Sequence, residues 1–333
     1  MRLVQLLHVA KGRALGIVDG ETLQLLNSYT SIYSLALSAI RSEQSMVKLA
    51  ASSLTGSSIP YDPVYSGQSD WRLLPAFDHP EEPARCLVSG TGLTHKASVD
   101  NRQAMHASEK AVVTDSMRMY QWGIEGGRPQ PGSVGAQPEW FYKGSGTILS
   151  GHGEPLPVPQ YAEDGGEEPE IVGAYVIDDS GRPWRVGMTI GNEFSDHKME
   201  KRNYLYLAPS KLRRCAIGPE LVVTPDFGAV AGVVRIERGG TTVWSKAIAS
   251  GESNMCHSVE NLEHHHFKYE AHRRPGDAHV HFFGAGAFSF GEGIELREGD
   301  IMEVAFPGFG RPLRNPLKVE NGAGVLVHVT AIS

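Results

Sequence analysis

Residues 167–200, EEPEIVGAYVIDDSGRPWRVGMTIGNEFSDHKME, constrain the fold of this chain more than any other segment. The apolar residues from Glu170 to Ile177 predict one strand, and those from Trp184 to Gly191 predict a second strand. The sequence Asp178-Asp179-Ser180-Gly181 separates them and is typical of a tight turn. The segment therefore predicts a β-hairpin.

Three carboxylates are predicted to meet at the open end of this hairpin. Glu168 and Glu170 are two residues apart, so in an extended chain their side chains leave the same face. If the turn is centred between Ser180 and Gly181, the residue opposite Glu168 is Glu193. Carboxylates this close raise one another's pKa values unless a cation neutralises them. An all-oxygen set suits Mg²⁺, for which Mn²⁺ or Ca²⁺ could substitute, whereas the alternative is a solvated acidic strand end that binds nothing.

The rest of the chain predicts an α+β, mainly β protein. Residues 1–28 contain three short strand patterns, VQLLH, ALGIVD and TLQLL, and Thr30-Ser31 offers caps for a helix that continues to about Ala51. Residues 52–83 are rich in Ser, Gly, Pro and Asp, so we expect the domain connection there. After Arg85, short apolar segments alternate with turn residues and predict a mixed or antiparallel β-sandwich or roll, with 97–122 as the best helix candidate. We expect a small α/β domain over 1–75 and a larger domain over 76–333.

Composition excludes several classes of protein. The chain has 31 basic and 38 acidic residues, and a net charge of -7 gives no reason to expect nucleic acid or an anionic membrane as a partner. His8, Lys11 and Arg13 interrupt the N-terminus before a signal-peptide core could form, and no apolar run is long enough to span a membrane. The 3 cysteines are an odd number without C-x-x-C spacing, which fits a reducing compartment, so we expect a cytoplasmic protein.

The order of several motifs resembles the fumarylacetoacetate hydrolase superfamily. Its Glu-x-Glu strand, its Asn-Asp-hydrophobic-Ser sequence and its Lys followed by Gly-Pro appear here as Glu168-Pro169-Glu170, Asn192-Glu193-Phe194-Ser195, and Lys211 with Gly218-Pro219. PEWFYKGSG at 138–146 and LREGDIMEVAFPGFGRPLRNPL at 296–317 are also similar, so the resemblance covers about residues 85–320. EWFYKGSG, EEPEIVGAYVID and YLYLAPSK look like the 2-keto-3-deoxy sugar-acid dehydratase branch.

The resemblance implies roles for eight residues and a fold of fumarylacetoacetate hydrolase type for 76–333. The implied metal ligands are Glu168, Glu170 and Glu193, the implied catalytic residues are His95 as base and Lys211 as proton donor or oxyanion stabiliser, and the implied substrate-binding residues are Lys143, Asp196 and Gly284. The third ligand is usually aspartate in the family, and Asp196 could substitute for Glu193. Gly284 belongs to Gly284-Ala285-Gly286, which replaces a Thr-containing glycine loop that binds substrate in the family.

The activity implied by the resemblance is the Mg²⁺-dependent dehydration of a small 2-keto acid, a 2-keto-3-deoxy sugar acid of sugar catabolism, through a metal-bound enolate. The resemblance also implies a homodimer. The same chemistry with a water molecule at a second carbonyl would cleave a C–C bond, and a C–C hydrolase of acylpyruvate or fumarylacetoacetate type is therefore the alternative. A second alternative is a non-catalytic keto-acid-binding protein, because the threonine of the substrate loop is missing.

Two histidine clusters are a competing signal. His264 and His266, like His279 and His281, alternate in sequence, and on strands each pair would share one face. Imidazoles grouped in this way could bind zinc. A cupin-type site needs a glutamate a few residues after His281, but the next one is Glu292. We therefore favour a hydrogen-bonded histidine set near the pocket or at a subunit contact.

Overall fold

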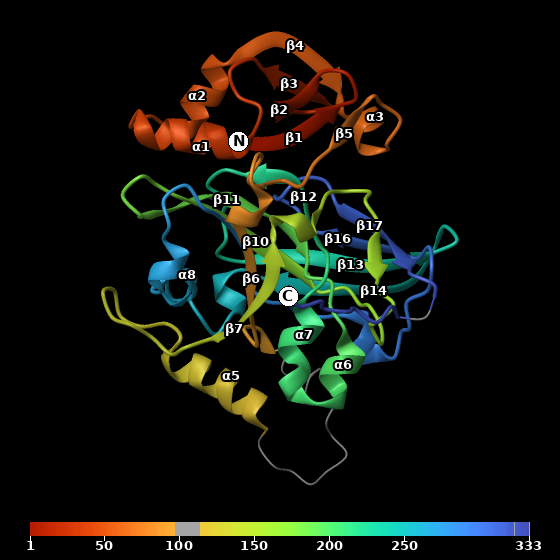
Figure 1. The fold of residues 1–333 in the computed structure, drawn as a ribbon. Coiled ribbons are helices and arrows are strands. Elements are labelled where there is room, and N and C mark those ends of the chain that lie inside the picture. Colours follow the sequence, from red (N-terminus) through yellow and green to blue (C-terminus); the bar gives the residue numbers. More distant parts are fainter. Residues whose placement is uncertain (97–113, 323, 333) are drawn as a thin grey trace.

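The computed structural model describes residues 1–96, 114–322 and 324–332 (Figure 1). Its strands are β1 (Arg2–His8), β2 (Gly12–Asp19), β3 (Thr22–Leu26), β4 (Leu54–Pro60), β5 (Trp71–Leu73), β6 (Cys86–Gly92), β7 (Glu139–Ser145), β8 (Leu149–Ser150), β9 (Leu156–Val158), β10 (Pro169–Ile177), β11 (Pro183–Asn192), β12 (Cys215–Val222), β13 (Val230–Arg238), β14 (Thr241–Ser250), β15 (Ala278–Phe282), β16 (Ile301–Ala305) and β17 (Leu313–Val319). Its α-helices are α1 (Ile32–Arg41), α2 (Met46–Ser52), α3 (Tyr61–Tyr65), α5 (Asp115–Gly126), α6 (His197–Arg202), α7 (Leu207–Lys211) and α8 (Val259–Phe267).

Two mixed sheets form the body of the protein. The larger sheet has the order β4-β3-β2-β1-β12-β11-β10-β15-β6-β7, and the smaller sheet has the order β14-β13-β16-β17-β9. Most neighbouring strands are antiparallel, whereas β15 and β6, β12 and β8, and β17 and β9 are parallel. The predicted α+β, mainly β fold class is confirmed. Among the described residues, no helix has the length and apolar character needed to cross a membrane.

The N-terminal strands β1 to β3 form as predicted, but the helix after them is divided. Ser31 caps α1 as expected, and its side chain accepts a hydrogen bond from the N–H of Ser34. The helix ends at Arg41, and Glu43, with a positive φ of 52°, separates it from α2. Strand β1 pairs with β12, so the N-terminal residues share a sheet with the rest of the chain, although they lie together at one end of the molecule (Figure 1). The division at residue 75 stays a prediction.

The segments before β6 and before β7 both differ in part from the expected structure. The segment 52–83, which was predicted as a connection, contains β4, α3 and β5, and β4 extends the N-terminal sheet by pairing with β3. Helix α5 covers the C-terminal part of the predicted helix 97–122 and continues to Gly126. Residues 97–113 of that prediction lie outside the described residues.

Strand β10 lies at the centre of the fold, between two apolar cores. Ile171, Tyr175 and Ile177 face a core that the smaller sheet closes with residues of β13, β16 and β17. Val172 and Ala174 face a second core, shared with α1, on the other side of the strand. Every residue of β10 is buried. A carboxylate at the end of this strand is therefore also kept from bulk water, which strengthens its interactions with neighbouring charges.

Candidate metal centre

The hairpin of β10 and β11 sets the position of the carboxylates. Pro169 pairs with Asn192, and one residue further the N–H of Glu193 donates to the carbonyl oxygen of Glu168 at 2.9 Å. Glu168 and Glu193 are therefore opposite each other, as the sequence predicts. Because Glu170 lies two residues further along the extended strand, its side chain leaves the same face as that of Glu168.

The turn that produces this register differs from the predicted turn. The N–H of Asp178 donates to the carbonyl oxygen of Arg182 at 2.9 Å, which centres the turn on Ser180 and not between Ser180 and Gly181. A β-bulge at the Ala174/Tyr175 step then shifts the register by one residue. The expected pairing of Glu168 with Glu193 is reached because the bulge compensates for the different turn.

The structure brings the three predicted ligands together. Glu168, Glu170 and Glu193 each offer a carboxylate oxygen, and these oxygens lie within 4.8 Å of one another. All three residues are buried. Burial and the charges of Glu193 and Glu168 raise the pKa of Glu170 well above its usual value. Burial and the charge of Glu168 also raise the pKa of Glu193. The cluster is therefore a place where negative charge is costly unless a cation is present.

Two buried lysines provide part of the compensating charge. Lys143 on β7 donates to Glu193 Oε1 at 2.5 Å and to the carbonyl oxygen of Phe194 at 2.9 Å. Lys211, at the end of α7, donates to Glu168 Oε1 at 2.6 Å and to Glu193 Oε2 at 2.9 Å. Although burial lowers the pKa of Lys211, Glu168 and Glu193 hold it well above its usual value. The same ammonium group holds the pKa of Glu168 well below its usual value against the opposing effect of burial.

The donor set fits a hard divalent cation. All three converging groups offer oxygen, and two ammonium groups against three carboxylates leave one unbalanced negative charge. The side chain of Glu168 is 11% exposed, while those of Glu193 and both lysines are 0–1% exposed, so solvent reaches the cluster from the side of Glu168. Mg²⁺ and similar hard cations bind to oxygen ligands, and buried carboxylates with an excess of negative charge favour such an ion.

His95 lies in the loop after β6 and is buried. The hydroxyl of Thr94 donates to the carbonyl oxygen of Phe283 at 2.7 Å, and Thr94 Oγ1 also lies 2.9 Å from His95 Nδ1. Since the hydroxyl proton is already used, Nδ1 donates to Thr94, and Nε2 is the basic nitrogen of the ring. Burial lowers the pKa of His95 to about 4. The imidazole is therefore neutral, and able to accept a proton, at neutral pH.

Gly284 connects the His95 loop with the carboxylates. Its N–H donates to Glu170 Oε2 at 2.7 Å. Its φ is +104°, and a Cβ atom at this position would lie 1.9 Å from Thr94 Oγ1, so only glycine fits here. The residue that was expected to contact substrate therefore also holds a predicted metal ligand. Gly284 supports the site in this way, and its contact with substrate stays a prediction.

The structure places Asp196 outside the cluster of Glu168, Glu170 and Glu193, so it is not needed as a substitute ligand, and its substrate-binding role stays a prediction. Its Oδ2 accepts a hydrogen bond from the guanidinium of Arg213 at 2.9 Å, and its Oδ1 accepts one from the N–H of Met199 at 2.9 Å. The second contact makes Asp196 the N-cap of α6. Aspartate is among the preferred residues at this position, and a buried aspartate beside an arginine is a charge-assisted pair.

Three residues of the site were not found from the sequence. His197 Nε2 lies 3.1 Å from Glu168 Oε1, the hydroxyl of Ser195 donates to Glu193 Oε1 at 3.0 Å, and Glu200 Oε1 lies 3.2 Å from Lys211 Nζ. If Asp196 had been recognised as an N-cap, a short helix would have been predicted after it, with His197 and Glu200, three residues apart, on one face. No sequence signal relates that face to Glu168.

The predicted histidine strand at His264–His266 is wrong, because these residues belong to α8. Ser258 begins this helix by accepting a hydrogen bond from the N–H of Asn261. His279 does lie on a strand, β15, and its Nδ1 is 3.0 Å from His266 Nε2. Within the described part of the chain, the only group of three or more converging potential metal ligands is the carboxylate set. The histidines thus form a hydrogen-bonded cluster, as favoured from the sequence.

We expect this histidine cluster to make the folded protein sensitive to acid. Burial lowers the pKa values of His279 and His281 to about 3, whereas an unfolded histidine has a pKa of about 6.5. As the pH falls below the unfolded value, only the unfolded chain gains these protons, so each histidine lowers the free energy of unfolding by up to about 1.4 kcal/mol per pH unit. The loss continues until the pH approaches the folded pKa values.

Denaturant unfolding between about pH 7.5 and pH 5 tests this expectation. His281→Asn is a suitable variant, because an asparagine amide can still bond the hydroxyl of Ser89, which lies 2.8 Å from His281 Nδ1. The unfolding free energy should depend less steeply on pH in this variant, because unfolding then takes up about one proton fewer. An unchanged slope would contradict the assignment of His281 as a neutral buried group.

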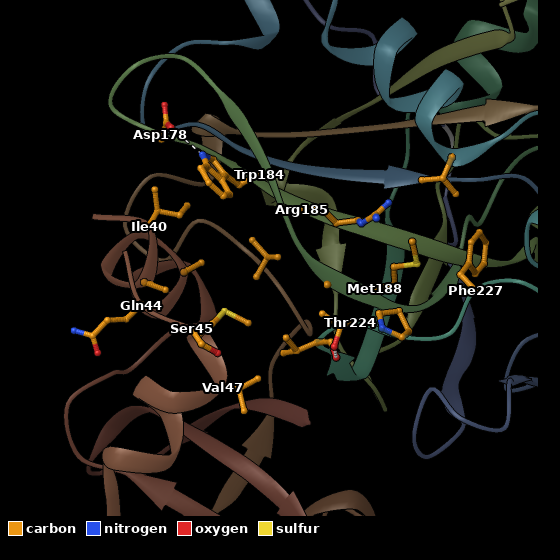
Figure 2. A pocket seen from close by; sticks show the side chains of 18 of the residues that line it. Ile40, Gln44, Ser45, Val47, Asp178, Trp184, Arg185, Met188, Thr224 and Phe227 are labelled. Carbon is orange, nitrogen blue, oxygen red and sulfur yellow. Dashed lines mark hydrogen bonds between the residues drawn. The ribbon is translucent and has the colours of Figure 1, made fainter. Parts of the chain in front are cut away.

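A cavity of about 1160 Å³ lies apart from the carboxylates, between the α1–α2 connection and β11. Figure 2 shows that Ile40, Gln44 and Val47 line one side of it, and that Trp184 and Met188 line the other. None of the eight predicted site residues contributes to its lining. The carboxylate cluster and this cavity are therefore separate features of the molecule.

Comparison with known proteins identifies relatives in both sequence and fold. No protein-family model matches the chain. The chain is similar to a probable 2-keto-3-deoxyxylonate dehydratase of Haloferax volcanii, with 29% identity over 180 residues, which are 52% of this chain and 58% of the relative. It is also similar to a 2-dehydro-3-deoxy-D-arabinonate dehydratase of Saccharolobus solfataricus, with 38% identity over 93 residues, which are 27% of this chain and 30% of the relative. Both alignments span less than two thirds of the relative.

The solved structure of a 2-keto-3-deoxy-D-arabinonate dehydratase complexed with magnesium and 2,5-dioxopentanoate has a similar fold. The TM-score is 0.70 at 20% sequence identity, and the match covers 97% of this chain and 100% of the other. At this level of identity the likeness concerns the fold. Together with the sequence relatives, it confirms the predicted resemblance to the 2-keto-3-deoxy sugar-acid dehydratases and their type of fold.

Proposed function

We propose that this chain, which has a fold of fumarylacetoacetate hydrolase type and is similar in sequence to 2-keto-3-deoxy sugar-acid dehydratases, is a Mg²⁺-dependent hydro-lyase acting on such a sugar acid. The observation that carries the proposal is the buried convergence of Glu168, Glu170 and Glu193. The fold neighbour complexed with magnesium and 2,5-dioxopentanoate supports the same ion and a small oxo acid as ligand here.

Charge favours the capture of an anionic keto acid at this site. Glu168, Glu170 and Glu193 would hold the cation, which would supply Lewis-acid polarisation of the substrate keto group. With a dication, Lys143 and Lys211 present, positive charge exceeds the three carboxylates by one, so a substrate carboxylate is attracted. Lys143 remains the proposed contact for this carboxylate or for a substrate hydroxyl, since its Nζ has a third donor beyond Glu193 and Phe194.

The chemistry requires a base, a stabiliser of negative charge and the departure of a hydroxyl group. Neutral His95 would remove a proton from carbon 3, next to the keto group, through its basic Nε2. The charged ammonium of Lys211 would stabilise the negative charge that develops on the keto oxygen, and its raised pKa suits this role better than proton donation. The hydroxyl of carbon 4 would then leave as water with the proton that His95 took from carbon 3, and a double bond would form between carbons 3 and 4.

Turnover of a substrate panel tests the proposal. The purified protein is incubated with Mg²⁺ and 2-keto-3-deoxy pentonates and hexonates, and formation of the dehydrated keto acid is followed. We expect turnover of at least one compound and its loss with a chelator. Cleavage of acylpyruvates without dehydration would support the C–C hydrolase, and Mg²⁺-dependent binding of keto acids without any turnover would support the non-catalytic binding protein.

We expect His95→Asn to lower kcat by about 10²- to 10⁴-fold, the usual contribution of a general base. The asparagine amide ends near the position of Nδ1 and can still bond the Thr94 hydroxyl, which lies 2.9 Å from His95 Nδ1. KM and Mg²⁺ affinity should change little, because His95 is not among the converging carboxylates. Wild-type kcat in this variant would exclude His95 as the base. The cytoplasmic location and the homodimer stay predictions.

A further inference from the structure

We infer that His197 is a positioning residue, which orients Glu168 for the cation and connects this ligand to the segment Gly284–Phe290. The inference rests on the proposed function, since it concerns the same metal site. His197 is the first residue of α6 and is 1% exposed. Its Nε2 lies 3.1 Å from Glu168 Oε1, and because a carboxylate only accepts, Nε2 donates this bond.

The hydrogen bonds to Glu168 select which oxygen faces the cation. Lys211 Nζ donates to Oε1 at 2.6 Å, and His197 donates to the same atom. Both donors thus hold Oε1, and we expect the cation to bind Oε2. Without His197 the carboxylate would be held by Lys211 alone, and its plane would be less well defined.

The ring of His197 is fixed by packing on several sides. It stacks on Phe288 with ring centroids 4.7 Å apart and an interplanar angle of 13°, and Phe290 lies 5.2 Å away. Gly166 lies against its Nδ1 edge, where a Cβ atom would come within 2.4 Å. His197 Nδ1 has no hydrogen-bond partner among the described residues. The orientation of the ring is therefore set by its stacking and by Glu168.

The same packing connects the metal ligand to the segment Gly284–Phe290. The N–H of Gly284 donates to Glu170 at one end of this segment, and the N–H of Ser289 donates to Glu167 Oε1 at 2.6 Å near the other end. Between these anchors, Phe288 stacks on His197, which bonds Glu168. Glu167 and Glu170 thus hold the segment directly, and Glu168 contacts it through His197. A shift of Glu168 on cation binding would be transmitted to Phe288.

The experiment compares His197→Asn with His197→Gln. The glutamine amide reaches about as far as Nε2 and can still donate to Glu168, whereas the asparagine amide ends near the position of Nδ1. By isothermal titration calorimetry we expect His197→Asn to weaken Mg²⁺ binding by about 10- to 100-fold and His197→Gln by less than about threefold. Hydrogen exchange of 284–290 should slow on Mg²⁺ addition in the wild type and less in His197→Asn.

The controls separate positioning from a general structural effect. Melting temperatures of the metal-free proteins should fall similarly in both variants, so only a positioning role separates their Mg²⁺ affinities. His152→Asn is a matched control, because His152 also stacks on an aromatic ring, Tyr65, with centroids 4.0 Å apart, but outside the carboxylate cluster. Its Mg²⁺ affinity should equal that of the wild type. If His197→Asn does not fold, His197→Phe, which keeps the ring and removes the donor, takes its place.

The outcomes distinguish this inference from the proposed function. A wild-type protein that binds no Mg²⁺ would overturn the proposed function and this inference with it. A wild-type protein that binds Mg²⁺, with equal affinities in His197→Asn and His197→Gln, would overturn the positioning role alone.

Discussion

Glu170→Gln is expected to lose Mg²⁺ binding and turnover and to keep its fold. Glu170 is one of three converging carboxylates, and a neutral amide is a much weaker ligand for a hard cation. The glutamine oxygen can still accept the hydrogen bond from the N–H of Gly284, which donates to Glu170 Oε2 at 2.7 Å. The substitution therefore removes a charge without leaving a buried donor unpaired.

The pH dependence of stability provides a second test of Glu170. Burial and the neighbouring carboxylates raise the pKa of Glu170 well above its ordinary value, so the unfolded chain ionises first as the pH rises. The wild-type, metal-free protein thus loses stability from this group as the pH rises above the unfolded value of about 4.3. Glu170→Gln lacks this loss and should be at least as stable as the wild type at neutral pH without metal.

Calorimetry with and without Mg²⁺ measures both effects. Mg²⁺ should raise the melting temperature of the wild type but not that of Glu170→Gln. Glu263→Gln is the control, because Glu263 bonds Tyr175 and Arg185 and is not among the converging carboxylates. Mg²⁺ affinity at the wild-type level in Glu170→Gln would exclude this residue as a ligand.

Lys211→Met should produce the largest loss of stability. Lys211 Nζ lies 2.6 Å from Glu168 Oε1 and 2.9 Å from Glu193 Oε2, and all three groups are buried. Removing one partner of a buried ion pair leaves an uncompensated charge, which costs about 3–5 kcal/mol. Turnover should also be lost, since the ammonium group is the proposed stabiliser of charge on the keto oxygen.

Mg²⁺ should partly restore the stability of Lys211→Met, because the cation neutralises the same carboxylates. Unfolding in denaturant with and without Mg²⁺ measures this, and the gain in free energy on adding Mg²⁺ should be larger in the variant than in the wild type. Lys198→Met is the control, since Lys198 forms an exposed pair with Glu295 at 3.2 Å and contributes little. If metal-free Lys211→Met were as stable as the wild type, the charge balance described for the site would be wrong.

The central part of the site could be predicted from the sequence because it depends on local rules. Strand alternation places Glu168 and Glu170 on one face, and a hairpin places Glu193 opposite Glu168. The turn and the bulge were both missed, and the correct pairing resulted because their effects on register cancel. The family resemblance added Lys143 and Lys211, whose side chains do contact the carboxylates.

The remaining features depend on contacts between distant segments. His197 meets Glu168 from 29 positions away in the sequence, and the stacking ring of Phe288 comes from another part of the chain. The histidines at 264–266 were assigned to a strand because alternation was taken as the signal, whereas the Ser258 cap determines a helix. Asp196 was considered a substitute ligand because the family usually has aspartate where Glu193 stands, but Arg213 and the N-terminus of α6 bind its carboxylate.

The central claim is that Glu168, Glu170 and Glu193 together bind one divalent cation. Anomalous diffraction from crystals soaked in Mn²⁺, which could substitute for Mg²⁺, tests this claim most directly. We predict one strong anomalous peak in contact with oxygens of all three carboxylates, with Lys211 displaced from at least one of them. An anomalous peak elsewhere, or none at these residues when Mn²⁺ is saturating, would contradict the account.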